Sequence, residues 1–477
     1  MNTSRTRVGL AGIGLEAYWP QFAGLEERLR GYVAKAAEKI SAMGVEVVDL
    51  GMVDTAQKGV EAGHRLRRED VDILVIYAMT YALSSSVLPM IQRARVPVLL
   101  LNLQPDLAID YAAFNALRDR TRMTGEWLAW CGTCPVPEIA NVMRRAGISV
   151  HQVTGVLEDD PDCWIEIEQW MRAANVVATL AANRIGLLGH YYSGMLDIYT
   201  DVTALCITFG GVVEMLEVDE LSALREQVTQ EEIGLRVREF QSHFAVESGC
   251  ASSELERAAR TSVALDRMVE QNELTALAYY HKGTGVPANE DTMSSIILGT
   301  SLLTARGVPV AGEYEVKNVL AMKIMDRLGA GGSFTEFYAL DLRDDVVLMG
   351  HDGPGHTGIA EGKPLVRPLD VYHGKVGRGL SVEMSVRNGP VTLLSVVEDP
   401  GTGKFLLLIA EGIVESGPRL EIGNTNSRFR FSLGARGFVN AWNAQGPAHH
   451  CAVGVGHHAE ELEKIAALLD IKAVRVC

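Results

Sequence analysis

The N-terminal part of the chain alternates between short, continuous apolar runs and longer amphipathic stretches. The apolar runs predict buried strands at 8–14, 45–50, 72–77, 96–102 and 147–153. The amphipathic stretches predict helices at 22–43, 55–68, 109–120, 136–145 and 160–182. Continuous apolar strands separated by helices are typical of a parallel sheet that is covered on both faces. We therefore expect an N-terminal α/β domain over residues 1–182.

The same alternation starts again after residue 183. Strands are predicted at 184–189, 212–216, 274–280 and 308–312. A helix is expected after 200–204, two or three surface helices over 218–272, and a single helix over 290–305. These elements predict a second, central α/β domain over 183–340. Open α/β sheets bind ligands beyond the carboxyl ends of their strands, which is where the loops 80–81 and 102–104 of the first domain lie. In the second domain, the strand at 184–189 runs into the polar aromatic loop 190–197.

The pattern changes beyond residue 340, where short or alternating apolar runs are separated by Gly, Pro, Asn and Asp. Strands are predicted at 346–349, 380–386, 391–397, 404–410 and 428–431, followed by a helix at 458–469 and a strand at 473–476. This texture is typical of antiparallel β structure, a sandwich or a small barrel, over 341–477. The expected fold class is α/β, with two Rossmann-like domains followed by a mostly antiparallel β domain.

Composition and charge exclude several partners. The chain has 477 residues, 47% of them hydrophobic and 22% charged, with a formal net charge of −16. Phosphate binding needs a basic surface, so nucleic acid is not an expected partner, and anionic lipid is disfavoured for the same reason. No apolar run approaches the length of about 18–20 residues that a membrane span requires, and the N-terminus shows no signal-peptide pattern. We expect a cytoplasmic protein without a membrane partner.

Two short motifs are too weak to indicate a cofactor. Gly9, Gly12 and Gly14 do not follow the G-x-G-x-x-G order of a dinucleotide site. Cys131 and Cys134 have the spacing of a redox or zinc motif, but no second pair accompanies them. A loop with two free thiols is the better interpretation.

Acidic and imidazole side chains gather in the second half of the chain. Glu313, Glu336 and His351 lie within about forty residues, each beside glycine or small residues. Seven histidines occur between 351 and 458: His351, His356, His373, His449, His450, His457 and His458. Carboxylate oxygen and imidazole nitrogen together suit a divalent cation such as Mn²⁺ or Mg²⁺. Since neighbours in a strand face opposite sides, only one of His449 and His450 can enter a given site.

These residues stand in motifs that resemble the L-arabinose isomerase and L-fucose isomerase superfamily. The motifs are Gly312-Glu313 with Lys317 four residues on, Gly332-Ser333-Phe334-x-Glu336-x-Tyr338, Gly350-His351, and Pro447-Ala448-His449-His450. Their order and spacing match that family, as does the succession of two α/β domains and a β domain. The resemblance implies a fucose-isomerase-like fold and a homo-oligomer, either a trimer or a hexamer.

The resemblance also implies an activity and a site. It implies an aldose–ketose isomerase that uses Mn²⁺, or another divalent metal such as Mg²⁺ or Co²⁺. The implied ligands are Glu313, Glu336, His351 and one histidine of the C-terminal pair, with His450 favoured over His449. The two glutamates would also be catalytic, carrying a proton between C1 and C2 of the sugar through an enediol. Which of them is the base stays open.

The expected partner is a small-molecule sugar, whose identity the sequence leaves open. Candidate sugar-binding residues are His190, Tyr191, Lys317, His356 and His449. Arabinose isomerases carry a histidine segment near position 130, where this chain has Cys131-Gly-Thr-Cys134. The alternatives are a related isomerase or epimerase acting on a sugar acid or a branched sugar, and a non-catalytic sugar-binding protein.

Overall fold

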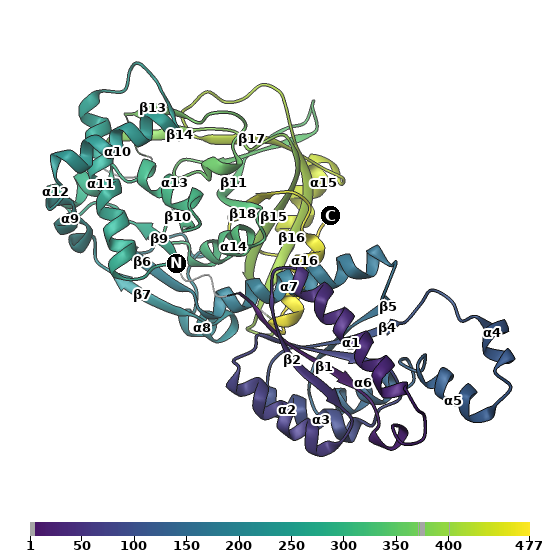
Figure 1. Cartoon of the computed structure of the whole chain (residues 1–477). Helices are drawn as coiled ribbons and strands as arrows, with labels where there is room; N and C mark the ends of the chain where they lie inside the picture. Colours follow the sequence, from purple (N-terminus) through teal and green to yellow (C-terminus); the bar gives the residue numbers. More distant parts are fainter. Residues whose placement is uncertain (1–4, 371, 373–376, 400) are drawn as a thin grey trace. The chain divides into compact units, whose positions relative to one another are not determined.

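The computed structural model describes residues 5–370, 372, 377–399 and 401–477. The chain forms two compact units, Met1–Ala178 and Thr179–Cys477 (Figure 1). Among the described helices, none is both long and apolar enough to cross a membrane. The fold class expected from the sequence is confirmed, whereas the division into three domains at 182/183 and 340/341 stays a prediction.

The first unit is built on a five-stranded parallel sheet with the order β2-β1-β3-β4-β5. Its strands are β1 (Arg7–Ile13), β2 (Glu46–Val53), β3 (Ile73–Ala78), β4 (Val98–Gln104) and β5 (Val150–Val156). Its helices are α1 (Leu25–Ala42), α2 (Ala56–Arg68), α3 (Ser84–Ala94), α4 (Tyr111–Ala116), α5 (Arg120–Leu128), α6 (Val136–Arg145) and α7 (Pro161–Ala181). A side chain at Gly9 of β1 would meet Leu66 of α2, and one at Gly12 would meet Val33 of α1. Because these two positions face opposite sides of the strand, helices cover both faces of the sheet.

The helix predicted at 109–120 is shorter than expected, because α4 covers 111–116 and a separate helix, α5, begins at Arg120. Asp110 and Asp119 each cap a helix start, accepting hydrogen bonds from the backbone N–H groups of Ala113 and Arg122. Arg118 between the helices has a left-handed φ of 55°. An N-cap aspartate satisfies free N–H groups only at a helix start, so the second aspartate begins a new helix.

The second unit contains a four-stranded parallel sheet with the order β10-β9-β6-β7. Its strands are β6 (Arg184–Gly189), β7 (Val212–Leu216), β9 (Ala276–Tyr280) and β10 (Val310–Ala311). The helices of this part are α8 (Val202–Phe209), α9 (Val218–Glu226), α10 (Gln230–His243), α11 (Ser252–Gln271), α12 (Pro287–Met293), α13 (Ile297–Ala305) and α14 (Val316–Arg327). The single helix predicted at 290–305 is wrong, since α12 ends before α13 begins. The hydroxyl group of Ser295 donates to the carbonyl of Asp291 at 2.8 Å and so competes with helix continuation.

The remainder of the second unit is a small β barrel. Six strands pair in the order β15-β18-β11-β12-β17-β16, and β16 pairs back to β15 to close the ring. They are β11 (Gly331–Asp341), β12 (Val346–His351), β15 (Gly389–Glu398), β16 (Phe405–Glu415), β17 (Thr425–Phe431) and β18 (His450–Val455). Around them lie β8 (Ala245–Val246), β13 (Leu365–Leu369), β14 (Gly379–Glu383), β19 (Lys472–Arg475), α15 (Gly434–Asn443) and α16 (Ala459–Leu468). Of the two expected forms of antiparallel structure, the barrel is the one that the strand pairing favours.

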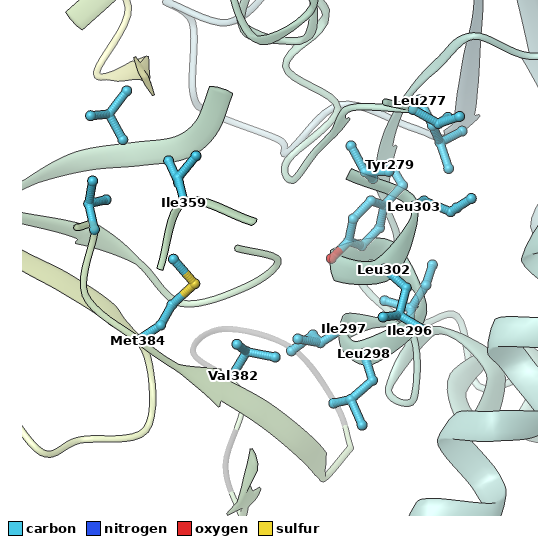
Figure 2. Close-up of a cluster of buried hydrophobic side chains, with 14 of the residues drawn as sticks. Leu277, Tyr279, Ile296, Ile297, Leu298, Leu302, Leu303, Ile359, Val382 and Met384 are labelled. Carbon is cyan, nitrogen blue, oxygen red and sulfur yellow. The ribbon is translucent and has the colours of Figure 1, made fainter. Parts of the chain in front are cut away.

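One apolar core joins the parallel sheet of the second unit to the barrel side. The buried helix α13 contributes Ile297, Leu298, Leu302 and Leu303, and Figure 2 shows them together with neighbours from two parts of the chain. One part contributes Leu277 and Tyr279 of β9, and the other contributes Val382, Met384 and Ile359. Because this core is continuous, the carboxyl ends of β9 and β10 have a fixed position relative to the barrel strands.

Candidate metal centre

A strained turn places Glu313 at the carboxyl end of β10. Glu313 and Tyr314 both have left-handed backbone angles, with φ of 58° and 65°. Such angles cost about 1–3 kcal/mol for residues other than glycine and persist only where the surroundings impose them. The N–H of Tyr314 donates to the carbonyl of Tyr279 at 3.0 Å, and that of Glu315 donates to Gly312 at 3.0 Å. These bonds hold the turn that carries the Glu313 carboxylate.

Three adjacent barrel strands supply the other acidic and imidazole groups. In the antiparallel register, Glu336 of β11 lies opposite His450 of β18 and Gly350 of β12. Directly opposite residues in such a pair point to the same face, so Glu336 and His450 share one side of the sheet. His351 follows Gly350, and its backbone N–H donates to the hydroxyl of Thr425 at 2.8 Å. A side chain at Gly350 would overlap the Thr425 backbone, so only glycine fits there.

The ligand atoms of these residues converge. One atom each of Glu336, His351 and His450 lie within 4.8 Å of one another, and the same holds for Glu313, His449 and His450. His450 belongs to both groups, and its Nε2 lies 3.4 Å from Glu313 Oε2. Each group combines a carboxylate with two imidazoles, and the two groups share His450, so together they offer oxygen and nitrogen donors that suit Mn²⁺, Co²⁺ or Mg²⁺.

His450 is buried and keeps open ring nitrogens. Its side chain has no exposed surface, and its ring packs 4.4 Å from that of Phe334. Within the described part of the chain, neither ring nitrogen makes a hydrogen bond. Burial, together with the charge of His449, lowers the pKa of His450 to about 3. The imidazole is therefore neutral, with a lone pair available to a cation.

The two glutamates of the cluster differ in how readily they ionise. Burial alone would raise the pKa of Glu313, but the close approach of His449 and the charges of His449, His450 and His351 hold it below its usual value. Burial raises the pKa of Glu336 to about 7, and the neighbouring Glu313 and Asp352 act in the same direction. Paired carboxyl groups with separated pKa values are a feature of acid–base sites.

A cavity of about 90 Å³ opens beside these groups. It is lined by Tyr279, Gly312, Glu313, Glu336, His351, Asp352, Gly353, Pro354 and Tyr372. The acidic groups, one histidine and two tyrosines can bind hydroxyl groups of a small polar molecule. Neither lysine nor arginine occurs among these lining residues.

The predicted sugar-binding residues do not line this cavity. Lys317 is buried on α14, and its Nζ donates to the backbone carbonyl of Asp197 at 2.7 Å. His356 is buried as well, and its backbone N–H donates to the hydroxyl of Ser333 at 3.1 Å. His449 is partly exposed, with its Nδ1 at 2.6 Å from Asp197.

The aromatic loop after β6 has its own contacts. His190 is exposed and lies with its ring edge toward Tyr280, at a centroid distance of 5.3 Å. Tyr191 packs against Tyr199 and Tyr314, at centroid distances of 4.9 and 4.8 Å. A sugar-binding role of these residues stays a prediction. His373, one of the seven clustered histidines, lies outside the described residues.

Sequence reasoning missed several residues around the cluster. Glu315 is fully buried, with an oxygen 3.7 Å from His450 Nδ1. Asp197 binds His449, and Tyr279 and Tyr372 line the cavity. Glu315 lies two residues from Glu313, and that spacing is the one available sequence signal. Asp197 and the tyrosines belong to no motif, so only the folded chain reveals their positions.

Comparisons with known proteins point to one family. Residues 331–472 match the family model of the L-arabinose isomerase C-terminal domain. The chain is 22% identical over 346 residues to L-arabinose isomerase of Pectobacterium atrosepticum, covering 69% of this chain and 66% of that protein. It is 23% identical over 353 residues to L-arabinose isomerase 1 of Bacillus licheniformis, covering 71% and 69%. The chain thus covers 66% and 69% of the length of these relatives, and the stretch matched by the family model includes the strands that carry Glu336, His351 and His450.

Proposed function

We propose that this chain, which matches the model of the L-arabinose isomerase C-terminal domain over residues 331–472 and resembles L-arabinose isomerases, is a metal-dependent sugar isomerase that interconverts an aldose and a ketose. The observation that carries the proposal is that two groups of possible metal ligands, Glu313-His449-His450 and Glu336-His351-His450, share His450, and that Glu313, Glu336 and His351 line a polar cavity. The family comparison alone rests on about 22% identity. The cluster adds the chemistry that such a reaction needs.

The proposed ligands of the cation are Glu313, Glu336, His351 and His450. The cation is Mn²⁺ in this proposal, with Mg²⁺ or Co²⁺ as alternatives of the same chemistry. A divalent cation bound there would polarise neighbouring oxygens of the sugar, which makes the hydrogen beside a carbonyl more acidic. His450 is favoured over His449 because it belongs to both donor groups and is buried.

Glu313 and Glu336 are proposed to move the proton between C1 and C2 through an enediol. Both carboxyl groups line the cavity, so each can reach a small molecule bound there. A carboxylate takes up a proton from carbon, and a carboxyl group gives one back, so a pair can serve the reaction in both directions. The assignment of the base to one member of the pair stays open.

The lining of the cavity favours a neutral sugar over a sugar acid. Recognition of a carboxylate group usually uses arginine or lysine, and neither is among the residues that line the cavity. Three acidic side chains, Glu313, Glu336 and Asp352, would instead repel the carboxylate group of a sugar acid wherever the cation does not neutralise it. We therefore place uncharged aldoses first among the substrates to test.

A substrate panel tests this function. Purified protein is stripped of metal, supplied with Mn²⁺, and incubated with pentoses, hexoses and deoxysugars while the aldose–ketose ratio is followed. We expect interconversion of at least one sugar, its loss in excess chelator, and its return with added Mn²⁺. Solvent deuterium at C1 or C2 of the product would support proton transfer. Turnover that persists in excess chelator would contradict the metal requirement.

Cytoplasmic location and assembly are further parts of the proposal. Both rest on the resemblance to arabinose isomerases. Light scattering coupled to size-exclusion chromatography tests the expected trimer or hexamer.

A further inference from the structure

One carboxylate holds His449 from a position 252 residues earlier in the chain. Oδ2 of Asp197 accepts a hydrogen bond from the backbone N–H of His449 at 2.9 Å and lies 2.6 Å from its ring Nδ1. The same oxygen therefore fixes both the backbone and the ring of this histidine. Two hydrogen bonds to one ionised group are stronger than bonds between neutral groups.

The other ring nitrogen of His449 faces the candidate metal centre. Its Nε2 lies 3.6 Å from Oε2 of Glu313. Because the two nitrogens are on opposite sides of the imidazole, a ring held at Nδ1 by Asp197 presents Nε2 to Glu313. His449 thus forms a bridge between the loop after β6 and the strained turn after β10.

Lys317 fixes the loop that carries Asp197. Its ammonium group donates to the backbone carbonyl of Asp197 at 2.7 Å, and the residue is only 5% exposed. Lys317 stands on α14, directly after the turn that carries Glu313. The turn and its helix are therefore connected to His449 through Asp197, and the lysine contacts the loop rather than the cavity.

We propose that Asp197 is a positioning residue, which orients His449 toward Glu313 and is itself held in place by Lys317. The inference rests on the proposed function, in that Glu313 is taken as a metal ligand and proton carrier. Asp197 does not line the cavity, so it acts through His449. His449 is the outer partner of the proposed ligand Glu313, and losing such a partner typically costs about 10- to 100-fold in metal affinity or activity; that cost is the upper bound for losing Asp197.

A double-mutant cycle tests whether Asp197 acts through His449. The variants are Asp197→Ala, His449→Ala and the double variant, each measured for Mn²⁺ affinity by titration calorimetry and for kcat/KM. We expect Asp197→Ala to lose about 10-fold or more in at least one of the two quantities. In the His449→Ala background, the same change is expected to cost less than about 3-fold, because its partner is already absent. Losses that multiply in the double variant would overturn the proposal.

Two further variants separate positioning from general damage to the loop. Asp201 lies on the same loop, where it caps α8 by accepting from the backbone N–H groups of Thr203 and Ala204. Asp201→Ala should therefore loosen the loop without changing Mn²⁺ affinity. Asp197→Asn keeps an oxygen that accepts both N–H groups, so it should lose less than Asp197→Ala. Equal losses in the alanine variants at 197 and 201 would contradict a specific role of Asp197.

A spectroscopic measurement tests the positioning role of Asp197 independently of the proposed isomerase activity. In protein labelled with ¹⁵N-histidine, the ring signals of His449, assigned by their absence in His449→Ala, should shift in Asp197→Ala and remain in Asp201→Ala. Neither this measurement nor the Mn²⁺ titration needs turnover. If no sugar reacts but the cycle on Mn²⁺ affinity shows coupling, the isomerase proposal fails and the positioning role stands. If a sugar reacts and the ring signals are unchanged in Asp197→Ala, the positioning role fails alone.

Discussion

The two parallel sheets of this protein have the same architecture and differ in what lies at their carboxyl ends. In both, buried strands alternate with helices, and loops leave the strand ends where α/β proteins bind ligands. The five-stranded sheet has polar groups there that bind one another. The four-stranded sheet has acidic groups that meet histidines from the barrel.

At the five-stranded sheet, several polar side chains satisfy each other, although the buried hydroxyl group of Thr80 makes no hydrogen bond to the described residues. The hydroxyl group of Thr133 donates to the amide oxygen of Asn102 at 3.0 Å, and Gln104 donates to Thr133 at 3.1 Å. The carboxylate of Glu138 accepts from the backbone N–H of Ser84 at 2.8 Å and from Tyr81 at 3.2 Å. These bonds hold the pKa of Glu138 below its usual value. A carboxylate bound in this way has little capacity left for a ligand.

At the four-stranded sheet, the polar groups are held close without being satisfied. Oε2 of Glu313 and both ring nitrogens of His450 are buried and make no hydrogen bond to the described residues. Leaving such groups without partners costs free energy in a folded protein. A bound cation would supply the missing interactions. Both sheets therefore place polar side chains at their strand ends. What distinguishes the four-stranded sheet is a strained turn and buried ligand atoms that lack hydrogen-bond partners.

The largest expected effect comes from exchanging one carboxyl group of the metal cluster and one at the five-stranded sheet. Glu336→Gln removes a proposed proton carrier and charged ligand, so kcat should fall by about 10²- to 10⁴-fold. Glu138→Gln also removes a carboxylate, but the two oxygens of Glu138 accept hydrogen bonds from Tyr81 and Ser84 and so hold the local structure. Its kcat should change by less than about 3-fold. Steady-state kinetics on a sugar found in the substrate panel measures both.

The same pair can break the comparison. A loss of activity in Glu138→Gln as large as that in Glu336→Gln, with the fold intact by circular dichroism, would place chemistry at the five-stranded sheet as well. Unchanged kcat in Glu336→Gln would remove the glutamate pair from the mechanism.

Two buried carboxylates sharpen the comparison at the level of metal affinity. Glu315 lies 3.7 Å from His450 Nδ1, so it can orient the ring and keep Nε2 directed at Glu313. Glu315→Gln should weaken Mn²⁺ binding by about 10- to 100-fold. Asp54 is equally buried at the five-stranded sheet, where it accepts from Trp19 and pairs with Lys58.

Asp54→Asn is the matched control for that change. It should leave Mn²⁺ affinity unchanged in titration calorimetry, because its partners are a tryptophan and a lysine of its own unit. If Glu315→Gln binds Mn²⁺ as tightly as the unmodified protein, Glu315 does not orient His450.

The sequence predicted what depends on local pattern. Continuous apolar runs located the parallel strands. Two of the predicted strands, 184–189 and 212–216, have the same bounds in the structure. Glu313, Glu336 and His351 stood out because their motifs are compact. The strands β11 and β18, which carry Glu336 and His450, were missed: β11 begins with two glycines, and the polar pair His449-His450 introduces β18. Gly332 has a φ of 126° and its Cβ would lie 2.6 Å from the Met322 carbonyl, so the glycine serves close packing there.

Contacts between distant residues could not be predicted in this way. The bond from His449 to Asp197 spans 252 residues, and no local pattern encodes the partner. Lys317 was interpreted from its motif as a sugar-binding residue, whereas its contact with the Asp197 carbonyl depends on how the loop after β6 folds. The break between α12 and α13 was missed as well, because a serine hydroxyl that donates back to a helix carbonyl occurs both at Ser295, where the helix is broken, and at Ser301, where α13 continues.

Two glycine-to-alanine exchanges test how closely the backbone is packed in the barrel and in the first unit. A side chain at Gly350 would overlap the backbone of Thr425 on the neighbouring strand. Gly350→Ala should therefore destabilise the protein by about 1–3 kcal/mol and displace His351. At Gly31, in α1 of the first unit, a side chain would meet no atom within 4 Å. Gly31→Ala should instead stabilise by about 0.5–1 kcal/mol, since alanine favours a helix interior.

Thermal unfolding and Mn²⁺ titration together check the glycine pair. Gly350→Ala should lower the unfolding temperature and the Mn²⁺ affinity, while Gly31→Ala should raise the former and leave the latter unchanged. If the Gly350→Ala protein were as stable as the unmodified protein, strands β12 and β17 could move apart enough to accommodate the added methyl group.

The smallest expected effect concerns a helix start beside the five-stranded sheet. Thr55 caps α2, and its hydroxyl oxygen accepts from the backbone N–H of Lys58 at 3.2 Å. Thr55→Ala leaves that N–H without its partner and should cost about 1 kcal/mol of stability. Thr55→Ser keeps the hydroxyl and should retain most of it. Because the cap belongs to the first unit and the metal cluster to the second, Mn²⁺ affinity should be the same in both variants. If Thr55→Ala lost Mn²⁺ affinity together with stability while Thr55→Ser did not, the two sheets would be energetically coupled. The five-stranded sheet could then no longer be regarded as purely structural.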